Sequence, residues 1–494
     1  MVDSPAASPA PTAPDPRPPA RIAALARAGA LNPQELPAAC ARLRAELRAI
    51  ASFVPATILR QQIDAPSPGR VSGAYWDGSV LFADMSGFTA LSGKLSALGK
   101  QGAEEISAII NALFGALVDE LHRHGGELLK FGGDALTAFF HASALGPSHA
   151  LIAARAALAL QERMVWFRAI ETRGGTFTLK LRVGVHSGRV FAAQVGDATH
   201  VELVVTGHDI NRVALAQEIA EPGEVVISEA TLALAPQVVA LERDAGFHLL
   251  LETPEAPPAR AWSWETAPGL TTGGERLEDL LALADRIDAL TPYLPHRLPR
   301  RFLEPAEGAA EIGEFRPVTV LFANFAPFSA ALDLLGDEAD TAARVLNAYY
   351  RRAQAAVHRY GGIVNKVDMY TSGDKLMALF GAPAAHEDDP ERAVRCALEL
   401  RTALEEANAE IAELLTNDQR PTTNEGHQKA AALPFVVPGA GYASGVRRAS
   451  CVGLTQKIGI NTGVVFTGLV GSARRHEYTV MGQPVNLAAR LMSA

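Results

Sequence analysis

The chain repeats itself, and this repeat constrains the fold more than any other feature. Residues 80–91 read VLFADMSGFTAL and residues 320–332 read VLFANFAPFSAAL, so an apolar run ending in Asp84 or Asn324 recurs 240 positions later. Further matching segments follow in the same order: 111–140 with 347–380, and 181–196 with 456–471. Long-range self-similarity of this kind indicates a tandem duplication of one structural unit.

Composition describes a globular protein and excludes several function classes. The 494 residues are 48% hydrophobic and 20% charged, with a net charge of −9, which argues against a nucleic-acid partner. Three cysteines (Cys40, Cys396 and Cys451) show no metal-ligand spacing, which is typical of a reducing compartment. The sequence shows neither an apolar run of membrane-spanning length nor a signal-peptide pattern, so we expect no membrane span and a cytoplasmic location.

The pattern along the chain divides it into five expected segments. They are a disordered Pro/Ala-rich tail (1–20), N-terminal helices with a linker (21–77), a first α/β module (78–265), a helical connector (266–313) and a second module (314–494). The second module carries an insert at 415–446 that we expect to be a mobile loop. It stops soon after Arg490, whereas the first continues, so we expect its last strand and a regulatory region beyond residue 494.

Hydrophobic periodicity predicts the elements of the N-terminal part and of the first module. We expect helices at 37–54 and 56–63, an irregular linker at 64–77, a strand at 79–84, a helix at 102–124, a hairpin over 127–140, a helix at 150–168, strands at 179–186, 189–195 and 202–205, a helix at 209–220 and a strand at 224–228. This alternation of strands and helices predicts an α/β module, and the matching segments predict the same order in the second copy.

Asp84 is the first candidate functional residue. It ends an apolar strand and precedes the small residues Ser86 and Gly87, whose amides could face a phosphate. A carboxylate beside a phosphate suits a site for a divalent cation and a nucleotide. Aspartate also begins turns and caps helices, so the motif alone leaves both interpretations open.

With both copies in view, the sequence resembles the class III adenylyl cyclase family, and most of all the two catalytic modules of the soluble, bicarbonate-responsive adenylyl cyclases. The motifs that carry the resemblance are FADMSGFT (82–89), GGELLKFGGDAL (125–136), RVGVHSGRV (182–190), GGIVNK (361–366) and RHEYTVMGQPVNLAAR (475–490). The resemblance covers about 78–265 and 314–494. It implies an α+β fold of two ferredoxin-like βαββαβ modules, arranged as an intramolecular head-to-tail pseudo-dimer with active sites in the cleft between them.

The resemblance implies that the first module holds metal and phosphate. The family makes cyclic AMP and pyrophosphate from ATP, and two Mg²⁺ ions, for which Mn²⁺ can substitute, assist attack of the ribose 3′-oxygen on the α-phosphorus. By resemblance Asp84, Asp134 and the carbonyl of Met85 bind these ions, since hard cations prefer oxygen ligands. The residues implied in binding the triphosphate are Met85, Ser86, Gly87, Phe88 and Thr89, through their amides, and Arg182.

The second module then supplies the base-binding and transition-state groups. Asn486 and Arg490 lie four residues apart, which places them on one face of a helix, and the resemblance assigns them to the ribose and the α-phosphate. Lys366 and Thr479 stand at the family's base-selecting positions, and the backbone of Val480 adjoins the base. A lysine donates to adenine N1, whereas guanine carries a donor there, so this pair favours ATP over GTP.

The two modules are unequal in these motifs. The first has Leu215 and Val204 at the positions of Arg490 and Thr479, and the second has Asn324 at the position of Asp84. Asn211 and Asp374 are retained as counterparts of Asn486 and Asp134. We therefore expect one competent site per chain, a degenerate second pocket, and no need for a homodimer.

The degenerate pocket is where the soluble relatives bind bicarbonate, through a lysine and an arginine of the first module. Lys130 matches the lysine, but Ala214 stands at the arginine position, with Arg212 two residues earlier. A small-molecule regulator in this pocket remains an expectation, and the loss of the arginine argues against bicarbonate.

Three alternatives stay open. A guanylyl cyclase is the main enzymatic one, although it would need acidic and small residues where Lys366 and Thr479 stand. The run Gly132-Gly133-Asp134 is also similar to the signature of diguanylate cyclases, but Ala135 follows where those enzymes have Glu. The third alternative is a catalytically silent nucleotide-binding sensor.

Overall fold

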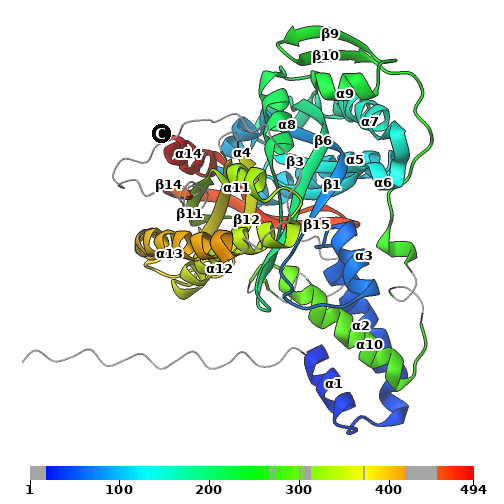
Figure 1. Ribbon diagram of the computed structural model, residues 1–494, viewed down its shortest axis with the longest axis vertical. Coiled ribbons are helices and arrows are strands. Elements are labelled where there is room, and N and C mark those ends of the chain that lie inside the picture. The colour runs from blue at the N-terminus through cyan, green and yellow to red at the C-terminus, as the bar shows by residue number, and fades with distance from the viewer. Residues whose placement is uncertain are drawn as a thin grey trace, which may run out of the picture.

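Two α/β modules lie side by side in the computed structural model, and helices from the N-terminus and the connector form a stalk that extends away from them (Figure 1). The structure describes residues 18–267, 270, 273–296, 298–299, 303, 313–370, 373–417 and 453–494. Helix α1 (Pro18–Arg27) begins inside the expected disordered tail, so the last three residues of that tail are helical. Residues 1–17 lie outside the described residues, as does most of the insert expected at 415–446, whose first three residues belong to helix α13 (Asp389–Asn417).

The first module has the expected βαββαβ order. Its elements are β1 (Ser72–Ser86), α5 (Lys100–Arg123), β2 (Glu127–Phe131), β3 (Ala135–His141), α7 (His149–Arg163) and β6 (Lys180–Gly196). The strands are ordered β2-β3-β1-β6 and all pair antiparallel, which is the ferredoxin-like arrangement. The sheet also contains β7 (Val201–Thr206), β8 (Val225–Ser228), β9 (Val239–Asp244) and β10 (Phe247–Glu252), and helices α8 (His208–Ile219) and α9 (Glu229–Leu234) connect these strands.

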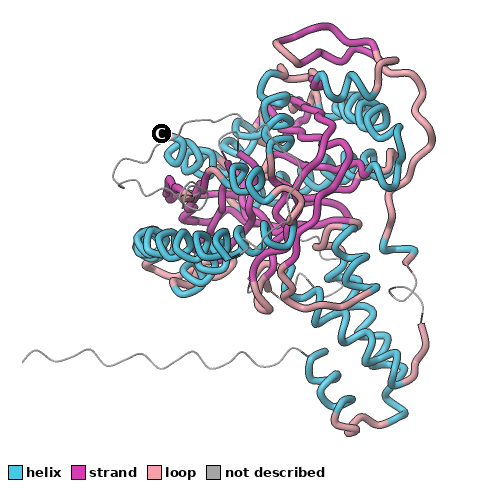
Figure 2. Tube along the Cα trace, viewed as in Figure 1, coloured by secondary structure: helices cyan, strands magenta, loops and turns pink. Residues whose placement is uncertain are grey.

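The second module repeats this topology. Its elements are β11 (Glu314–Ala326), α11 (Phe328–Leu335), α12 (Ala339–Arg359), β12 (Ile363–Tyr370), β13 (Gly373–Phe380), α13 (Asp389–Asn417), β14 (Thr455–Ser472), β15 (Arg475–Met481) and α14 (Gln483–Ser493). The strand order β12-β13-β11-β14 matches β2-β3-β1-β6 of the first module, and β15 corresponds to β7. The expected fold of two ferredoxin-like modules is therefore confirmed. Helices pack against the strands of both modules (Figure 2), and α5 and α12 also contact strands of the other module.

Several expected boundaries in the first module were wrong. The strands predicted at 179–186 and 189–195 are the single strand β6, because Ser187 and Gly188 stay paired with Ser79 and Gly78 of β1. The expected linker 64–77 contains the beginning of β1, since this pairing continues as far as Ser72. Several shorter elements were not expected, among them α4 (Phe88–Ser96), the 3₁₀ turn η3 (Met164–Phe167) after α7, the strands β4 (Ile170–Thr172) and β5 (Gly175–Phe177), and the elements α9, β9 and β10.

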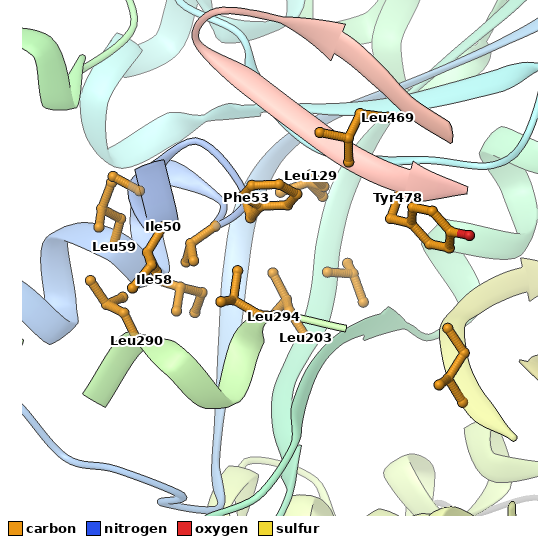
Figure 3. Close-up of a cluster of buried hydrophobic side chains, with 14 of the residues drawn as sticks. Ile50, Phe53, Ile58, Leu59, Leu129, Leu203, Leu290, Leu294, Leu469 and Tyr478 are labelled. Atoms are coloured by element: carbon orange, nitrogen blue, oxygen red, sulfur yellow. The ribbon is translucent and has the colours of Figure 1, made fainter. Parts of the chain in front are cut away.

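The stalk and both modules share one hydrophobic core. Helices α2 (Leu36–Ala51), α3 (Ala56–Asp64) and α10 (Leu277–Leu290) pack together, and their buried side chains continue into strands of both modules. Figure 3 shows this continuity from Ile50 and Leu290 of the stalk, through Phe53 and Leu294, to side chains of four strands: Leu129 (β2), Leu203 (β7), Leu469 (β14) and Tyr478 (β15). The stalk is therefore part of the folded core.

Two hydrogen bonds attach the stalk, one to each module. The backbone N–H of His476 in β15 donates to the carbonyl of Ser52 at 2.6 Å. The Tyr293 hydroxyl, from the turn η5 (Thr291–Tyr293), donates to the side chain of Gln194 in β6. The stalk is thus hydrogen-bonded to both modules.

In the part of the chain that the structure describes, no helix has both the length and the apolar character that crossing a membrane requires. Cys40 and Cys396 are buried and form no disulfide, while Cys451 lies outside the described residues.

In each module one helix packs closely against a glycine of a strand: α14 against β14, and α8 against β6. A Cβ atom at Gly459 of β14 would lie 2.3 Å from both the Ala488 carbonyl oxygen and the Met492 nitrogen of α14. At the matching position of the first module, a Cβ atom at Gly184 would lie 2.5 Å from the nitrogen of Gln217 in α8. Only glycine permits this close approach, which fixes the depth at which α14 and its polar residues sit.

We expect Gly459→Ala to displace α14 and to destabilise the protein by about 1–3 kcal/mol, because the added methyl meets backbone atoms that cannot rotate away. The thermal unfolding midpoint measures the effect. The control is Gly93→Ala in α4, where a Cβ atom meets nothing within 4 Å, so the midpoint should stay the same or rise slightly. A wild-type midpoint for Gly459→Ala would contradict the close seating of the helix.

Candidate functional site

The two modules meet through a reciprocal contact of their hairpins. Strand β2 of the first module lies against β15 of the second, and β12 of the second lies against β7 of the first. The N–H of Phe131 in β2 donates to the carboxylate of Glu477 in β15 at 3.0 Å. A Cβ atom at Gly133 would lie 3.9 Å from the carbonyl oxygen of Val480. The loop before Asp134 therefore borders the strand that carries Thr479 and Val480.

Asp84 and Asp134 come together on neighbouring strands of the first module. Asp84 pairs with Ala135 across β1 and β3, and the N–H of Met85 donates to the Asp134 carbonyl at 3.1 Å. Burial, with a further contribution from the charge of Asp84, raises the pKa of Asp134 to about 7. Burial also raises the pKa of Asp84, although Arg182 opposes this shift. The two carboxylates thus form one electrostatically coupled pair.

Arg182 has a different partner in this structure from the one the resemblance implies. It stands opposite Asp84 in the β1–β6 register, and its guanidinium pairs with one carboxylate oxygen of Asp84. The resemblance implies a phosphate contact for Arg182, which stays a prediction, and in this structure its guanidinium lies against the Asp84 carboxylate. In this position Arg182 is the positively charged partner of the Asp84 carboxylate.

The donor set at Asp84 and Asp134 fits a divalent cation with hard-ligand preferences. The two carboxylates are half-buried, and the charge of Asp84 adds to the effect of burial in raising the pKa of Asp134. A cation between them would offset both effects. Among the described residues, no group of three or more His, Cys, Asp or Glu side chains is placed to hold a metal. The protein would therefore provide the two carboxylates and the Met85 carbonyl, which leaves positions for phosphate oxygens and water, as Mg²⁺ prefers.

The predicted phosphate-binding residues form the turn between β1 and α4. Gly87 has φ +97°, and a Cβ atom there would lie 2.4 Å from the Thr178 carbonyl oxygen, so the turn requires glycine. Helix α4 begins at Phe88, which directs the amides of its first turn toward this corner. The side-chain amide of Asn486 lies 3.5 Å from the Thr89 hydroxyl, so α14 of the second module reaches the same turn.

Lys366 and Thr479 lie together in the second module, as the resemblance implies. The Lys366 Nζ is 3.2 Å from the Thr479 hydroxyl and 2.8 Å from Glu477 Oε1, and it also donates to the Phe131 carbonyl of the first module. Lys366 is almost completely buried, with 2% of its surface exposed. Burial lowers the pKa of Lys366, but the facing acidic groups, Glu477 first, outweigh burial and raise it. The ammonium is therefore charged at neutral pH.

Arg490 is the predicted site residue that the structure leaves apart from the others. It lies one turn beyond Asn486 on α14 and is exposed. Within the described residues its side chain forms no hydrogen bond or ion pair with Asp84 or Asp134. The helix brings Asn486 to the turn at Thr89, and Arg490 follows on the same face.

The second pocket has a related arrangement with several groups replaced. Lys130 lies 3.4 Å from Glu202 and 3.2 Å from the Leu203 carbonyl, and it donates to the Val367 carbonyl of the other module. Asp374 takes the position of Asp134, but Thr206 donates to its carboxylate at 2.8 Å. The Asn324 amide donates to the Asp374 backbone carbonyl at 3.1 Å. A neutral amide thus faces the backbone where the first site has a second carboxylate.

Two acidic residues of the cleft were missed by the sequence reasoning. Glu477 and Glu202 occupy matching positions on β15 and β7, each two residues before Thr479 or Val204. Because side chains alternate along a strand, the residue two before Thr479 faces the same side. This alternation could have identified Glu477 from the sequence, because the motif RHEYTV contains both Glu477 and Thr479.

Comparison with known proteins adds a family match and three similarities. A profile of the adenylate and guanylate cyclase catalytic domain family matches residues 72–247 and 310–494. Adenylate cyclase type 10 of Homo sapiens is 26% identical over 450 residues, which are 86% of this chain and 24% of that protein. Adenylate cyclase 1 of Rhizobium meliloti is 26% identical over 170 residues, which are 34% of this chain and 25% of that protein. The chain thus spans about a quarter of the length of these curated relatives.

A solved structure gives the third similarity. The crystal structure of a class III adenylyl cyclase-like ATP-binding protein from Pseudomonas aeruginosa matches with a TM-score of 0.53 and covers 88% of both chains. The sequences are 14% identical, so this match concerns the fold. It covers both modules, in agreement with the tandem arrangement described above.

The carboxyl group of Asp374 gives a pH-dependent prediction. Burial raises the pKa of Asp374 to about 7, above its ordinary value near 4, so the folded protein loses stability as pH rises from about 4 to about 7. Asp374→Asn removes the titrating group. We expect the free energy of unfolding of this variant, measured relative to wild type, to be about 2–3 kcal/mol higher at pH 8 than at pH 5.

Urea unfolding at pH 5 and pH 8 measures this difference. The exposed Asp64→Asn variant is the control, and its pH dependence should follow that of the wild type. A constant difference between Asp374→Asn and wild type at the two pH values would show that Asp374 is ionised throughout, contrary to its burial.

Proposed function

We propose an activity for this chain from one premise: the chain belongs to the adenylate and guanylate cyclase catalytic domain family. The proposed reaction is the conversion of ATP to 3′,5′-cyclic AMP and pyrophosphate at one site between the two modules. The observation that carries the proposal is the contact of the Asp134 hairpin with β15, through Phe131 and Glu477 at 3.0 Å. This contact joins the carboxylates of one module to the base-selecting pair of the other. The names of the relatives, adenylate cyclase type 10 and adenylate cyclase 1, support it.

Each residue of the site has a proposed task. Asp84, Asp134 and the Met85 carbonyl would hold divalent metal ions, Mg²⁺ or Mn²⁺, which when bound neutralise the triphosphate and activate the ribose 3′-hydroxyl. The amides from Met85 to Thr89 would bind the terminal phosphates at the beginning of α4. Arg182, now beside Asp84, carries the charge that an incoming phosphate would share.

The second module would orient the nucleoside. Asn486, 3.5 Å from Thr89, is placed to hold the ribose, and Arg490 would meet the charge that develops on the α-phosphate. Lys366 is held as an ammonium, so it can donate to the unprotonated N1 of adenine. Guanine presents N1–H at this position, which would oppose a cation, so we propose ATP as the substrate.

Two other functions remain as alternatives. A guanylyl cyclase is favoured by the Glu477 carboxylate in the base pocket, but its oxygens already accept from Lys366 and from the Phe131 N–H. A nucleotide-binding sensor without turnover is favoured by Arg490, which lies exposed on α14 and apart from the carboxylates. A small-molecule regulator in the pocket of Lys130 is a further proposal. Because Ala214 stands where the bicarbonate-binding relatives have an arginine, bicarbonate is a poor candidate.

We expect the purified chain to form cyclic AMP from ATP with Mg²⁺ or Mn²⁺, and to form much less cyclic GMP from GTP. Asp84→Ala and Arg490→Ala should each lower kcat by about 100-fold or more, because each removes charge stabilisation at the reacting phosphate. Chromatography of the products measures both rates. Asn324→Ala and Leu215→Ala, the matching positions in the other pocket, are the controls and should retain activity. Cyclic GMP as the main product would overturn the use of Lys366, and no product from either nucleotide would favour the sensor.

A mixing experiment tests whether one chain contains the whole site. Asp84→Ala damages the first module and Arg490→Ala the second, so an equimolar mixture of the two variants should stay as inactive as either alone. If modules paired between chains, about a quarter of the pairings would combine two intact halves. Recovery of activity on mixing, measured as cyclic AMP formed, would therefore contradict the intramolecular pair.

A further inference from the structure

The base-selecting lysine has no unused hydrogen-bond donor. A lysine ammonium carries three N–H groups. The Lys366 Nζ has three protein acceptors: the Phe131 carbonyl, the Glu477 carboxylate at 2.8 Å and the Thr479 hydroxyl at 3.2 Å. A purine can therefore receive a hydrogen bond from Lys366 only if it replaces one of these acceptors. The neutral Thr479 hydroxyl is the weakest of the three, because the carboxylate contact is charge-assisted and the Phe131 carbonyl is buried.

Glu477 connects this lysine to the other module. One carboxylate oxygen accepts from Lys366, and the other accepts from the Phe131 N–H at 3.0 Å. Phe131 ends β2, three residues before Asp134. Arg475 approaches the same carboxylate at 3.8 Å. The pKa of Glu477 is lowered because the opposite charges, Lys366 first, outweigh its burial. The residue thus stays ionised between two cations while it accepts a backbone bond.

The matching acid of the other pocket lacks these supports. Glu202 contacts Lys130 at 3.4 Å, and this is its one hydrogen-bonded partner among the described residues. Burial raises the pKa of Glu202 to about 6, in contrast to the lowered pKa of Glu477. The two pockets therefore differ in how firmly their lysine is held, and the firm arrangement lies in the pocket with the complete set of predicted site residues.

We propose that Glu477 is a positioning residue that sets the purine selectivity of this site. It anchors Lys366 against the Phe131 carbonyl, so that the Thr479 contact is the one that adenine replaces, and it joins base recognition to the hairpin of Asp134. The inference rests on the proposed function, because it assigns a role within that nucleotide site. Without the carboxylate, the ammonium loses its orientation and its preference for an acceptor at N1.

The test compares Glu477→Gln with its matched control Glu202→Gln. Glutamine keeps the size and one acceptor but removes the charge. We expect Glu477→Gln to raise KM for ATP about tenfold and to lower the ATP-over-GTP ratio of kcat/KM by about tenfold or more, with kcat changed less than about threefold. Glu202→Gln should keep both quantities within about twofold of wild type. Unchanged selectivity in Glu477→Gln, or an equal change in the two variants, would overturn the proposal.

A charge-swapped variant decides the case in which Glu477→Gln fails to fold. Lys366→Glu with Glu477→Lys retains an ion pair but places an acceptor toward the purine N1, so its selectivity should shift toward GTP. A wild-type ratio in this folded variant would overturn the proposal. Calorimetric binding of ATP and GTP to each variant separates this proposal from the proposed function. A chain that forms no cyclic nucleotide but prefers ATP in a Glu477-dependent way would refute the cyclase activity and support the role of Glu477.

Discussion

The arrangement of the two modules depends on a pair of buried lysines that each cross the interface. Lys366 of the second module donates to the Phe131 carbonyl of the first, and Lys130 of the first donates to the Val367 carbonyl of the second. A buried ammonium is unfavourable unless it is paired and fully hydrogen-bonded. Each module therefore supplies acceptors that the other requires, and β2, β7, β12 and β15 can meet in one register only. The site follows from that register, because Asp134 and Thr479 lie on these same hairpins and strands.

Duplication produced the symmetry, and substitution at a few positions removed it. Because Asn324 stands at the position of Asp84, the second pocket has one carboxylate of the pair, Asp374. The Thr206 hydroxyl donates to it. The second pocket thus holds one buried acid with a hydroxyl partner, whereas the first retains two neighbouring acids near an arginine. Repulsion that an added cation would relieve is typical of a site arranged for ligands at the expense of stability.

Much of this could be predicted from the sequence, because the repeat and its motifs identify the modules, and the βαββαβ order follows from them. Lys366 and Thr479 lie together as expected. Contacts between strands remote in sequence were not predictable in the same way: the pairing of Arg182 with Asp84 depends on the β1–β6 register, which continues through Ser187 and Gly188. The role of Glu477 depends on a backbone N–H in the other module, a group that no motif encodes.

The stalk limits how the two halves can move. It contacts β15 through Ser52 and His476, and β6 through Tyr293 and Gln194, while its apolar side chains enter the core of both modules. A sliding displacement of one module along the other would break both hydrogen bonds and expose apolar surface. Helices α2 and α10 therefore tie β15 of one module to β6 of the other, so that a displacement of either helix would strain the contacts of both modules at once.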